Sequence, residues 1–417
     1  MHCSCFQVLA AALALVAGLQ LLYLGLLSGL HGQDQRSHYA GLFRGHGRPL
    51  PWDGHKERFE RVLAGGGTLD ASGQYRIYHD VLQATWGGRS RQDVVLVTHT
   101  SLGNLHHAQQ LAERWQGPIS VALFAPGLAD VRLATVMVYA LAALCPPVRQ
   151  LFRLHLVCPA EQVATFPESE DHPELGRLKS CSDVYVRLAR VGAGRRNYAM
   201  DVANASYPNN LLRNVARRAV GGHWVLVVDM DMVPSEGLRE AFLALPRAPD
   251  EGTPGVYVVP AFEIRHTRRI PGSKTELLQL YQVGEIRPFY EELCLRCQAP
   301  TNYSHWLNLP VGGPLRVAYE VEWRDPWEPF YIGASSVPPY DERFKQYGFN
   351  RISQACELHV AGYRFSVLSN AFLVHKGFKV ASEFHAQKDA ENQRNKVLFR
   401  QFKQELKAKY PASPRRC

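Results

Sequence analysis

The sequence lacks several features that mark common protein classes. It has no internal repeat, which excludes a solenoid and a duplicated enzyme. It also has no run of basic residues interleaved with aromatic side chains, although Lys and Arg total 47 against 38 Asp and Glu. Nucleic acid is therefore not expected as a partner, whereas the formal charge of +9 suits an anionic small substrate.

Cysteine spacing gives little support to a zinc site. The C-x-x-C pair Cys294-Leu-Arg-Cys297 has no second pair to accompany it, and one pair alone is weak evidence for zinc. In an oxidising compartment, a local disulfide or pairing with more distant cysteines is the better interpretation.

Charged side chains are absent from residues 6–30, which are rich in Leu, Ala and Val. About 20 apolar residues span a bilayer, so we expect a transmembrane signal anchor here, after a cytoplasmic tail of residues 1–5. A cleaved signal peptide is the alternative, but this stretch is longer than a usual signal core and no basic region precedes it. The lack of Lys and Arg before the segment is opposite to the usual charge bias, so a lumenal body needs other support.

Two other features favour a lumenal position for the body. Asn204-Ala-Ser206 and Asn302-Tyr-Ser304 are N-glycosylation sequons, which makes Asn204 and Asn302 predicted modification sites. The cysteines beyond the apolar segment fit disulfides with one thiol left over: Cys145, Cys158, Cys181, Cys294, Cys297, Cys356 and Cys417. Cys3 and Cys5 would face the cytosol, where acylation stays an open question.

The rest of the chain divides into a stem and one large body. Residues 31–58 are rich in Gly, His, Arg and Gln without periodicity and are interpreted as a stem, followed by a catalytic body over residues 59–417. Strands are predicted over 93–99, 119–124, 151–158 and 255–262, and helices over 105–115, 131–144 and 386–409. This alternation predicts an α/β fold with a mostly parallel central sheet. Thr98 and His99 would emerge at the carboxyl end of a strand, where such sheets bind ligands.

The stretch His223-Trp-Val-Leu-Val-Val-Asp-Met-Asp-Met-Val-Pro-Ser235 is an apolar run that ends in two carboxylates. If the run is a strand, Asp229 and Asp231 project from the same face. Adjacent carboxylates repel each other unless a cation or proton intervenes. Oxygen ligands favour a hard divalent ion, Mg²⁺ or Mn²⁺, which also holds substrate phosphates. A solvated strand end is the alternative interpretation.

These carboxylates suggest transfer of a sugar from a nucleotide diphosphate, because a metal stabilises the charge that develops on a departing phosphate. His375 ends the strand-like run Phe372-Leu-Val-His375 and is a third candidate metal ligand, although a capped core histidine fits equally well. The neighbouring Lys376 is placed to meet a phosphate.

Arg213 lies one helical turn after Asn209 and Asn210, so the three side chains share a helix face. Asn210 and Arg213 are candidate nucleotide-sugar ligands, because a guanidinium matches a phosphate or a sugar carboxylate. A surface arginine without a partner is the alternative. Arg265 and Arg268 are further candidate partners for a sugar carboxylate.

Asp341 and Glu342 are candidates for the general base that deprotonates an acceptor hydroxyl. Inverting transfer requires one carboxylate on the acceptor side. The alternative is an acidic helix start, where the helix dipole favours Asp and Glu.

Several motifs together resemble the Golgi beta-1,4-glucuronyltransferases, which are related to the glucuronyltransferase domain of the LARGE glycosyltransferases. The resemblance covers the apolar segment and essentially the whole body. The motifs are Tyr207-Pro-Asn-Asn-Leu-Leu-Arg-Asn214, Val228-Asp-Met-Asp-Met-Val-Pro-Ser235, Val259-Pro-Ala-Phe-Glu-Ile264, Gln298-Ala-Pro-Thr-Asn-Tyr-Ser304, Asp341-Glu-Arg-Phe344, Tyr347-Gly-Phe-Asn-Arg-Ile-Ser-Gln-Ala355 and Val374-His-Lys-Gly-Phe378.

The resemblance implies a GT-A-type nucleotide-sugar transferase fold and a single-pass type II protein of the Golgi membrane. It also implies a Mn²⁺-dependent, inverting transfer of glucuronate from UDP-glucuronic acid to a β-linked xylose in a beta-1,4 linkage. The product would prime the laminin-binding O-mannosyl glycan of alpha-dystroglycan, which the LARGE glycosyltransferases extend. The family's metal motif corresponds to Asp229 and Asp231, and its glycosylation sites correspond to Asn204 and Asn302.

Two other functions compete with this one. The first is an N-acetylglucosaminyltransferase of poly-N-acetyllactosamine synthesis, which differs in the charge of the donor sugar. The second is a non-catalytic glycan-binding scaffold for a partner transferase. The presence of both Asp229 and Asp231 argues against the scaffold, because a binding module gains nothing from their repulsion.

Overall fold

The computed structural model describes residues 20, 53–84, 93–166, 178–193, 206–220, 224–246, 254–383 and 386–417. The chain divides into two compact units, residues 1–52 and 53–417. Apart from Gln20, the expected tail and anchor lie outside the described residues, as do most of the expected stem and Asn204. Within the described ranges, no helix has the length and apolar character needed to cross a membrane.

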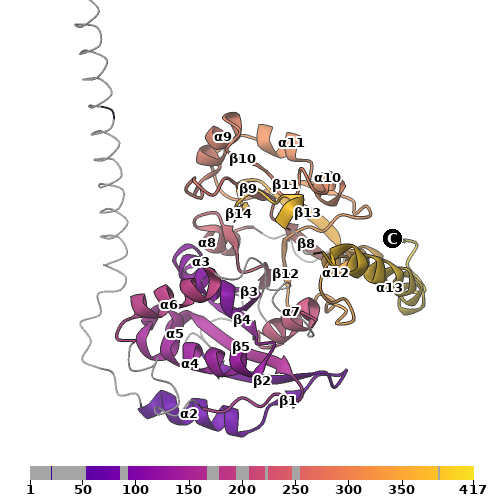
Figure 1. Cartoon of the computed structure of the whole chain (residues 1–417). Helices are drawn as coiled ribbons and strands as arrows, with labels where there is room; N and C mark the ends of the chain where they lie inside the picture. Colours follow the sequence, from indigo (N-terminus) through magenta and orange to yellow (C-terminus); the bar gives the residue numbers. More distant parts are fainter. Residues whose placement is uncertain are drawn as a thin grey trace, which may run out of the picture. The chain divides into compact units, whose positions relative to one another are not determined.

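The second unit begins with helix α2 (Asp53–Ala64), slightly before the expected start of the body. Its larger sheet runs through the centre of the unit (Figure 1). The strands lie in the order β1 (Thr68–Leu69), β2 (Tyr75–Leu82), β5 (Phe152–Pro159), β4 (Ile119–Phe124), β3 (Val94–Ser101), β6 (Trp224–Val227), β12 (Tyr331–Ala334), β8 (Gly255–Val258), β13 (Arg364–Leu368) and β11 (Val317–Val321).

The large sheet is mixed, which corrects the prediction of a mostly parallel sheet. Strands β5, β4, β3 and β6 are mutually parallel and form the predicted α/β core. Beyond them, β12 lies between β6 and β8 and is antiparallel to both, and β1, β2 and β11 also pair antiparallel with their neighbours. The prediction was made from the first strands and helices, where crossover helices enforce parallel pairing.

A second sheet of the described residues has the order β10 (Ile286–Pro288), β9 (Ala261–Ile264), β14 (Leu373–Lys376) and β7 (Met232–Pro234). The strand predicted over 255–262 is therefore two strands, β8 and β9, which belong to different sheets. Pro260 lies between them and has no N–H to donate, so it favours the interruption. The register places His375 opposite Met232, directly after Asp231.

Helices cover both faces of the parallel core. Val94 and Leu96 of β3 pack in one apolar cluster with α4 (Leu128–Leu144), whereas Val95 and Val97 pack in another with α7 (Asn209–Arg218). Alternate residues of a strand face opposite sides, so the two clusters lie on opposite faces of the sheet. The predicted helix over 105–115 begins as a 3-10 turn (Leu102–His107) and continues as α3 (Ala108–Trp115).

The remaining helices are mostly short. The remaining helices are α5 (Pro146–Leu151), α6 (Cys181–Ala193), α8 (Leu238–Leu243), α9 (Lys274–Gln282), α10 (Leu295–Gln298), α11 (Tyr303–Asn308), α12 (Asn350–Val360) and α13 (Lys388–Lys409), with 3-10 turns at Ala299–Thr301 and Ala381–Glu383. Of these, α10 and α11 lie within the segment 277–341, which has little regular pattern in the sequence.

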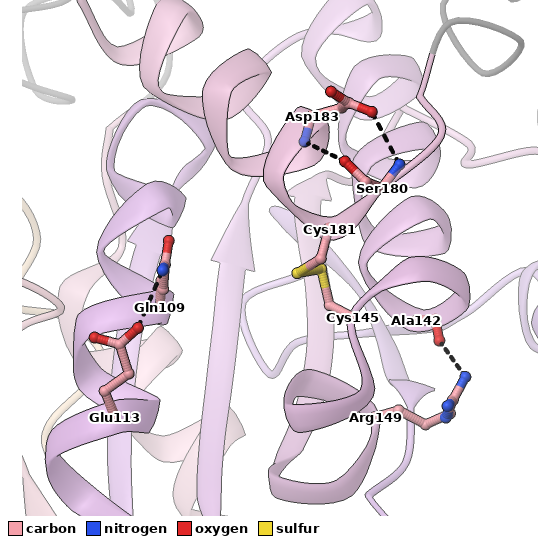
Figure 2. Close-up of a disulfide and its surroundings, with 8 residues drawn as sticks. All are labelled: Gln109, Glu113, Ala142, Cys145, Arg149, Ser180, Cys181 and Asp183. Carbon is pink, nitrogen blue, oxygen red and sulfur yellow. Dashed lines mark hydrogen bonds between the residues drawn. A yellow bond between two sulfur atoms is a disulfide. The ribbon is translucent and has the colours of Figure 1, made fainter. Parts of the chain in front are cut away.

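Three disulfides join the described cysteines and leave a buried thiol at Cys158. The Cys145–Cys181 bond links the start of α5 to the start of α6 (Figure 2). The Cys294–Cys297 bond is the local one of the two pairings that the sequence left open, and Cys356–Cys417 ties α12 to residues beyond α13. This pattern agrees with the expectation of disulfides plus one remaining thiol.

Helix α13 also fixes the loop that leads into α12. The Asn395 side-chain amide donates to the backbone oxygens of Lys345 at 2.9 Å, Tyr347 at 2.8 Å and Gly348 at 2.9 Å. A buried amide that satisfies several carbonyls holds a loop in one conformation. The first turn of α12, which carries Arg351, is positioned by this loop.

Candidate active site

Asp229 and Asp231 lie in a tight turn that connects β6 of the large sheet to β7 of the smaller one. The backbone N–H of Met232 donates to the oxygen of Asp229 at 3.0 Å, which closes the turn. The prediction that strand alternation aligns the two carboxylates is therefore wrong, because β6 ends at Val227. A turn brings the two side chains close by a different geometry and gives each its own surroundings.

Asp229 faces cationic and hydrogen-donating groups. Arg351 Nη2 lies 2.7 Å from Oδ2, while Arg213 Nη2 and His99 Nε2 lie 3.2 Å and 3.3 Å from Oδ1. Burial opposes ionisation, but Arg351, His99 and Arg213 outweigh it and hold the pKa of Asp229 well below its usual value. The Asp229 side chain is 32% exposed, against 3% for Arg213 and 9% for Arg351. The two arginines therefore support the carboxylate from behind.

Helices α7 and α12 meet through the side chains of Asn210 and Arg213. The Asn210 amide donates to the backbone oxygens of Asp341 at 2.8 Å and Asn350 at 3.1 Å, and its Oδ1 accepts from Arg213 at 2.9 Å. Arg213 also donates to Asn350 Oδ1 at 3.0 Å. The shared helix face predicted for Asn210 and Arg213 is present, and it is turned inward. Arg213 is buried and has several partners, which excludes the alternative of a surface arginine without a partner.

His99 lies on β3 and is buried beneath Asp229. Its Nδ1 is 2.8 Å from the Tyr207 hydroxyl, and burial lowers the pKa of His99, so the ring is neutral. The ionised Asp229 carboxylate 3.3 Å from His99 Nε2 favours a proton on that nitrogen, and the Tyr207 hydroxyl then donates to Nδ1. Thr98 is fully buried and its hydroxyl has no partner among the described residues.

Asp231 faces a histidine, and no arginine contacts it in the described chain. His375 Nε2 lies 3.2 Å from Asp231 Oδ2, and His375 Nδ1 lies 2.8 Å from the backbone oxygen of Gly377. A carbonyl can only accept, so Nδ1 carries a proton, and His375 Nε2 faces the Asp231 carboxylate either through a shared proton or through a bound cation. Burial opposes ionisation of Asp231, but His375 and Lys379 outweigh it and lower the pKa of Asp231.

The Asp231–His375 pair fits a divalent cation. A carboxylate oxygen and an imidazole lone pair facing each other at 3.2 Å repel unless a proton or cation lies between them. Carboxylate and imidazole together suit Mn²⁺. No group of three or more His, Cys, Asp or Glu side chains in the described ranges converges as a complete metal site. Substrate oxygens would have to supply further ligands.

Three further predicted site residues have exposed side chains. Lys376 ends β14 with an exposed side chain. Arg265 and Arg268 are more than half exposed and pair with Glu285 at 3.5 Å and 3.1 Å, and neither contacts Asp229.

The two predicted bases both have partners of their own. Asp341 accepts three bonds from the Arg343 guanidinium, and Arg343 N–H also donates to it at 3.0 Å. Glu342 accepts from Asn214 at 2.9 Å and Arg218 at 2.8 Å. The alternative of an acidic helix start is also not found, because Asp341 and Glu342 lie in a turn and α12 begins only at Asn350.

Three residues of the site escaped the sequence analysis. Arg351 belongs to the Tyr347–Ala355 motif, but its partner Asp229 is 122 positions away, so no spacing links them. His107 lies near Asp231 and His375, and burial lowers its pKa to about 4, with His106 adding to the effect. Glu328 lies in an irregular segment, and burial raises its pKa to about 7. Only the motif containing Arg351 offered a signal.

Comparison with known proteins decides the family. Residues 93–411 match the family described as "Glycosyl-transferase for dystroglycan". The chain belongs to this family. The match runs from β3 to α13, which includes the Asp229–Asp231 turn and α12, and it confirms the prediction of a glycosyltransferase.

Two relatives with the same name align with the whole chain, and a third aligns with part of it. The chain is similar to "Beta-1,4-glucuronyltransferase 1" of Homo sapiens, at 55% identity over 100% of this chain and 98% of that protein. The protein of the same name from Danio rerio is 52% identical over 100% and 99%. "Xylosyl- and glucuronyltransferase LARGE1" of Mus musculus is 27% identical over 75% of this chain and 35% of its own length. The predicted resemblance to the beta-1,4-glucuronyltransferases is confirmed.

The predicted glycosylation site Asn302 is exposed on the surface of the described body. Its Oδ1 caps helix α11 by accepting from the His305 N–H at 3.3 Å. The side-chain nitrogen, to which a glycan attaches, points to no partner that would have to be released. Modification of Asn302 stays a prediction that this geometry permits.

Proposed function

We propose that this protein transfers glucuronate from UDP-glucuronic acid to a β-linked xylose, with inversion and in a beta-1,4 linkage. The observation that carries the proposal is the full-length similarity, at 52% and 55% identity, to proteins named beta-1,4-glucuronyltransferase 1. The fold would be of the GT-A type, and the chemistry would centre on the turn between β6 and β7.

Asp231 and Asp229, at the two ends of the turn, are assigned different roles. Asp231 and His375 would hold Mn²⁺, which when bound neutralises the charge that develops on the departing diphosphate. Asp229 was also predicted as a metal ligand; its two oxygens already accept from Arg213 and Arg351, so we assign it first to fixing these guanidinium groups. Preorganised cations beside a leaving group lower the barrier without reorganisation of solvent.

The charge of the site favours an acidic donor sugar over N-acetylglucosamine. Arg213 and Arg351 carry two positive charges beside Asp229, and Glu328 is a further acidic group within electrostatic range. Because both arginines lie behind Asp229, their charge attracts a substrate carboxylate through the field of the site and not by direct contact. The neutral N-acetyl group of the alternative donor lacks this attraction.

The cellular setting belongs to the same proposal. We infer a single-pass type II protein of the Golgi membrane, with residues 6–30 as the anchor and the body in the lumen. Three disulfides in the described body support an oxidising compartment. The acceptor would be the xylose-terminated O-mannosyl glycan of alpha-dystroglycan, and LARGE enzymes would use the product.

A donor screen with the detergent-solubilised full chain tests the proposal. A xylose-terminated acceptor is incubated with Mn²⁺ and either UDP-glucuronate or UDP-N-acetylglucosamine, and the product is identified by mass and linkage analysis. We expect transfer from UDP-glucuronate at least tenfold faster, because only that donor adds a sugar carboxylate on which the guanidinium charge can act. Equal or faster transfer of N-acetylglucosamine contradicts the donor assignment, and absence of any transfer favours the scaffold.

A further inference from the structure

Glu328 lies between β11 and β12 with a partly exposed side chain. Its carboxylate forms no hydrogen bond or ion pair with any residue that the structure describes. A carboxylate that is partly removed from water and has no protein partner is costly in free energy, which points to a partner outside the protein.

The backbone that carries Glu328 is fixed from both sides. Its N–H donates to the backbone oxygen of Cys297 at 3.0 Å, and its oxygen accepts from the Gln298 side chain at 3.2 Å. The preceding Trp327 is fully buried and donates from its indole to Thr301 at 3.0 Å. A rigid backbone beneath an unpartnered carboxylate is the arrangement expected of a group that must meet a substrate at a defined position.

Glu328 is part of the Asp229 end of the site. Two positions further along, the Phe330 ring packs 3.9 Å from the guanidinium of Arg351, which in turn binds Asp229. Arg351, Asp229 and Arg213 all lie within electrostatic range of the Glu328 carboxylate, as do the hydroxyls of two tyrosines, Tyr290 and Tyr347. These groups set the electrostatic surroundings of the Glu328 carboxylate.

The environment also suits proton transfer near neutral pH. Burial raises the pKa of Glu328 to about 7, and Asp229 adds to this rise while Arg351 and Arg213 oppose it. A general base works best when its pKa lies near the operating pH.

We propose that Glu328 is the general base of the transfer reaction. The inference rests on the proposed function and deepens it. Glu328 takes the proton of the acceptor hydroxyl, whose oxygen forms a bond to the anomeric carbon of the glucuronate. The bond from that carbon to the diphosphate oxygen breaks, and UDP leaves with the electron pair. Asp341 and Glu342 are less suited to this role, because each is already neutralised by an arginine.

The test compares Glu328→Gln, Glu328→Asp and wild type in the full chain, with UDP-glucuronate, Mn²⁺ and the xylose-terminated acceptor. Glutamine keeps the shape and removes the base, so kcat should fall about 100-fold or more. Thermal stabilisation by UDP-glucuronate with Mn²⁺ should stay unchanged, because donor binding does not need the base. Aspartate keeps the chemistry on a shorter side chain, so its kcat should lie between the other two.

The pH profile and two controls make the result specific. Wild type and Glu328→Asp should lose kcat/KM as the pH falls below about 7, and the residual activity of Glu328→Gln should lack this acidic limb. Glu320→Gln, at an exposed partner of Arg364, should behave as wild type. Glu342→Gln should keep most of its activity.

Several outcomes would overturn the inference. A kcat of Glu328→Gln within threefold of wild type excludes a general base at this position. A loss of kcat matched by an equal loss of donor-induced stabilisation indicates a binding role instead. If wild type itself fails to transfer glucuronate, the proposed function fails; if wild type is active and Glu328→Gln is too, only the assignment of Glu328 fails.

Discussion

The two ends of the β6–β7 turn contain the same acidic side chain in opposite surroundings. Asp229 is held by Arg213 and Arg351, whose side chains are almost completely buried. Asp231 contacts the imidazole of His375 and has no arginine contact in the described chain. Both side chains keep about a third of their surface exposed, at 32% and 33%. Exposure therefore does not distinguish them, and the neighbouring groups do.

The difference indicates that the Asp229–Asp231 motif has two separate functions. A carboxylate already neutralised by guanidinium groups organises a buried cationic cluster, whereas a carboxylate facing an imidazole nitrogen requires a proton or a cation between them. The turn places the two side chains in separate environments, because β6 and β7 belong to different sheets. Replacing each residue in turn should therefore give different kinds of loss.

The largest effect is expected for Asp231→Asn. Loss of the anionic ligand should lower kcat/KM about 1000-fold and abolish the thermal stabilisation by Mn²⁺, while the melting temperature without metal stays near that of wild type. Kinetics over a series of Mn²⁺ concentrations measures this. Asp389→Asn, on the exposed first turn of α13, is the matched control and should have wild-type activity. Full activity of Asp231→Asn would remove the distinction between the two ends.

His375→Ala should give the next largest effect. The Mn²⁺ concentration for half-maximal activity should rise about 10- to 100-fold, because the imidazole lone pair beside Asp231 is lost. Raising Mn²⁺ should restore most of the activity, unlike in Asp231→Asn. His305→Ala, at an exposed histidine, serves as the control. An unchanged metal requirement would contradict a role of His375 in metal binding.

Arg351→Met should reduce stability more than metal binding. It leaves Asp229 with one fewer cation, and for a partly exposed carboxylate we expect a loss of about 2 kcal/mol in the free energy of unfolding. Adding Asp229→Asn should restore about half of that loss but no activity. Urea unfolding measures both variants, and Arg364→Met, at an exposed arginine, should change stability by less than about 0.5 kcal/mol. A fully additive double variant would disprove the coupling.

The smallest predicted effect is on acid stability. Because the pKa of Asp229 in the folded protein lies below its unfolded value of 3.8, its contribution to stability is complete above about pH 4. That contribution is lost as the pH falls further. Between pH 5 and pH 3, Asp229→Asn should therefore lose about 1 kcal/mol less than wild type, as measured by urea unfolding. Parallel losses in both proteins would show that Asp229 is not ionised by its arginines.

The sequence predicts the part of the fold in which neighbours in space are neighbours along the chain. Strands β3, β4 and β5 and helix α4 lie close to their predicted bounds, since each is a largely apolar run bounded by polar or turn residues. The position of β12 between β6 and β8 has no local signal, because pairing partners are chosen by long-range packing. The prediction of a mostly parallel sheet fails for that reason.

The candidate site was predictable only where residue chemistry is local. Asp229, Asp231 and His375 stood out because polar residues end apolar runs. Arg351 and Glu328 come from a helix start and an irregular loop, and only folding brings them to the turn. The carboxylates Asp341 and Glu342 have the right chemical type, but arginine partners that no spacing reveals occupy them.

Gly377 shows how a residue without a side chain selects the chemistry of its neighbour. Its φ of +102° is rarely accessible to other residues, and this conformation aims its carbonyl at His375 Nδ1. That carbonyl decides which ring nitrogen keeps its proton, and hence which one offers electrons. Any other amino acid at position 377 would rotate the peptide and release the imidazole to its second tautomer. Inactivation would then arise from backbone geometry alone, with every reactive group still in the sequence.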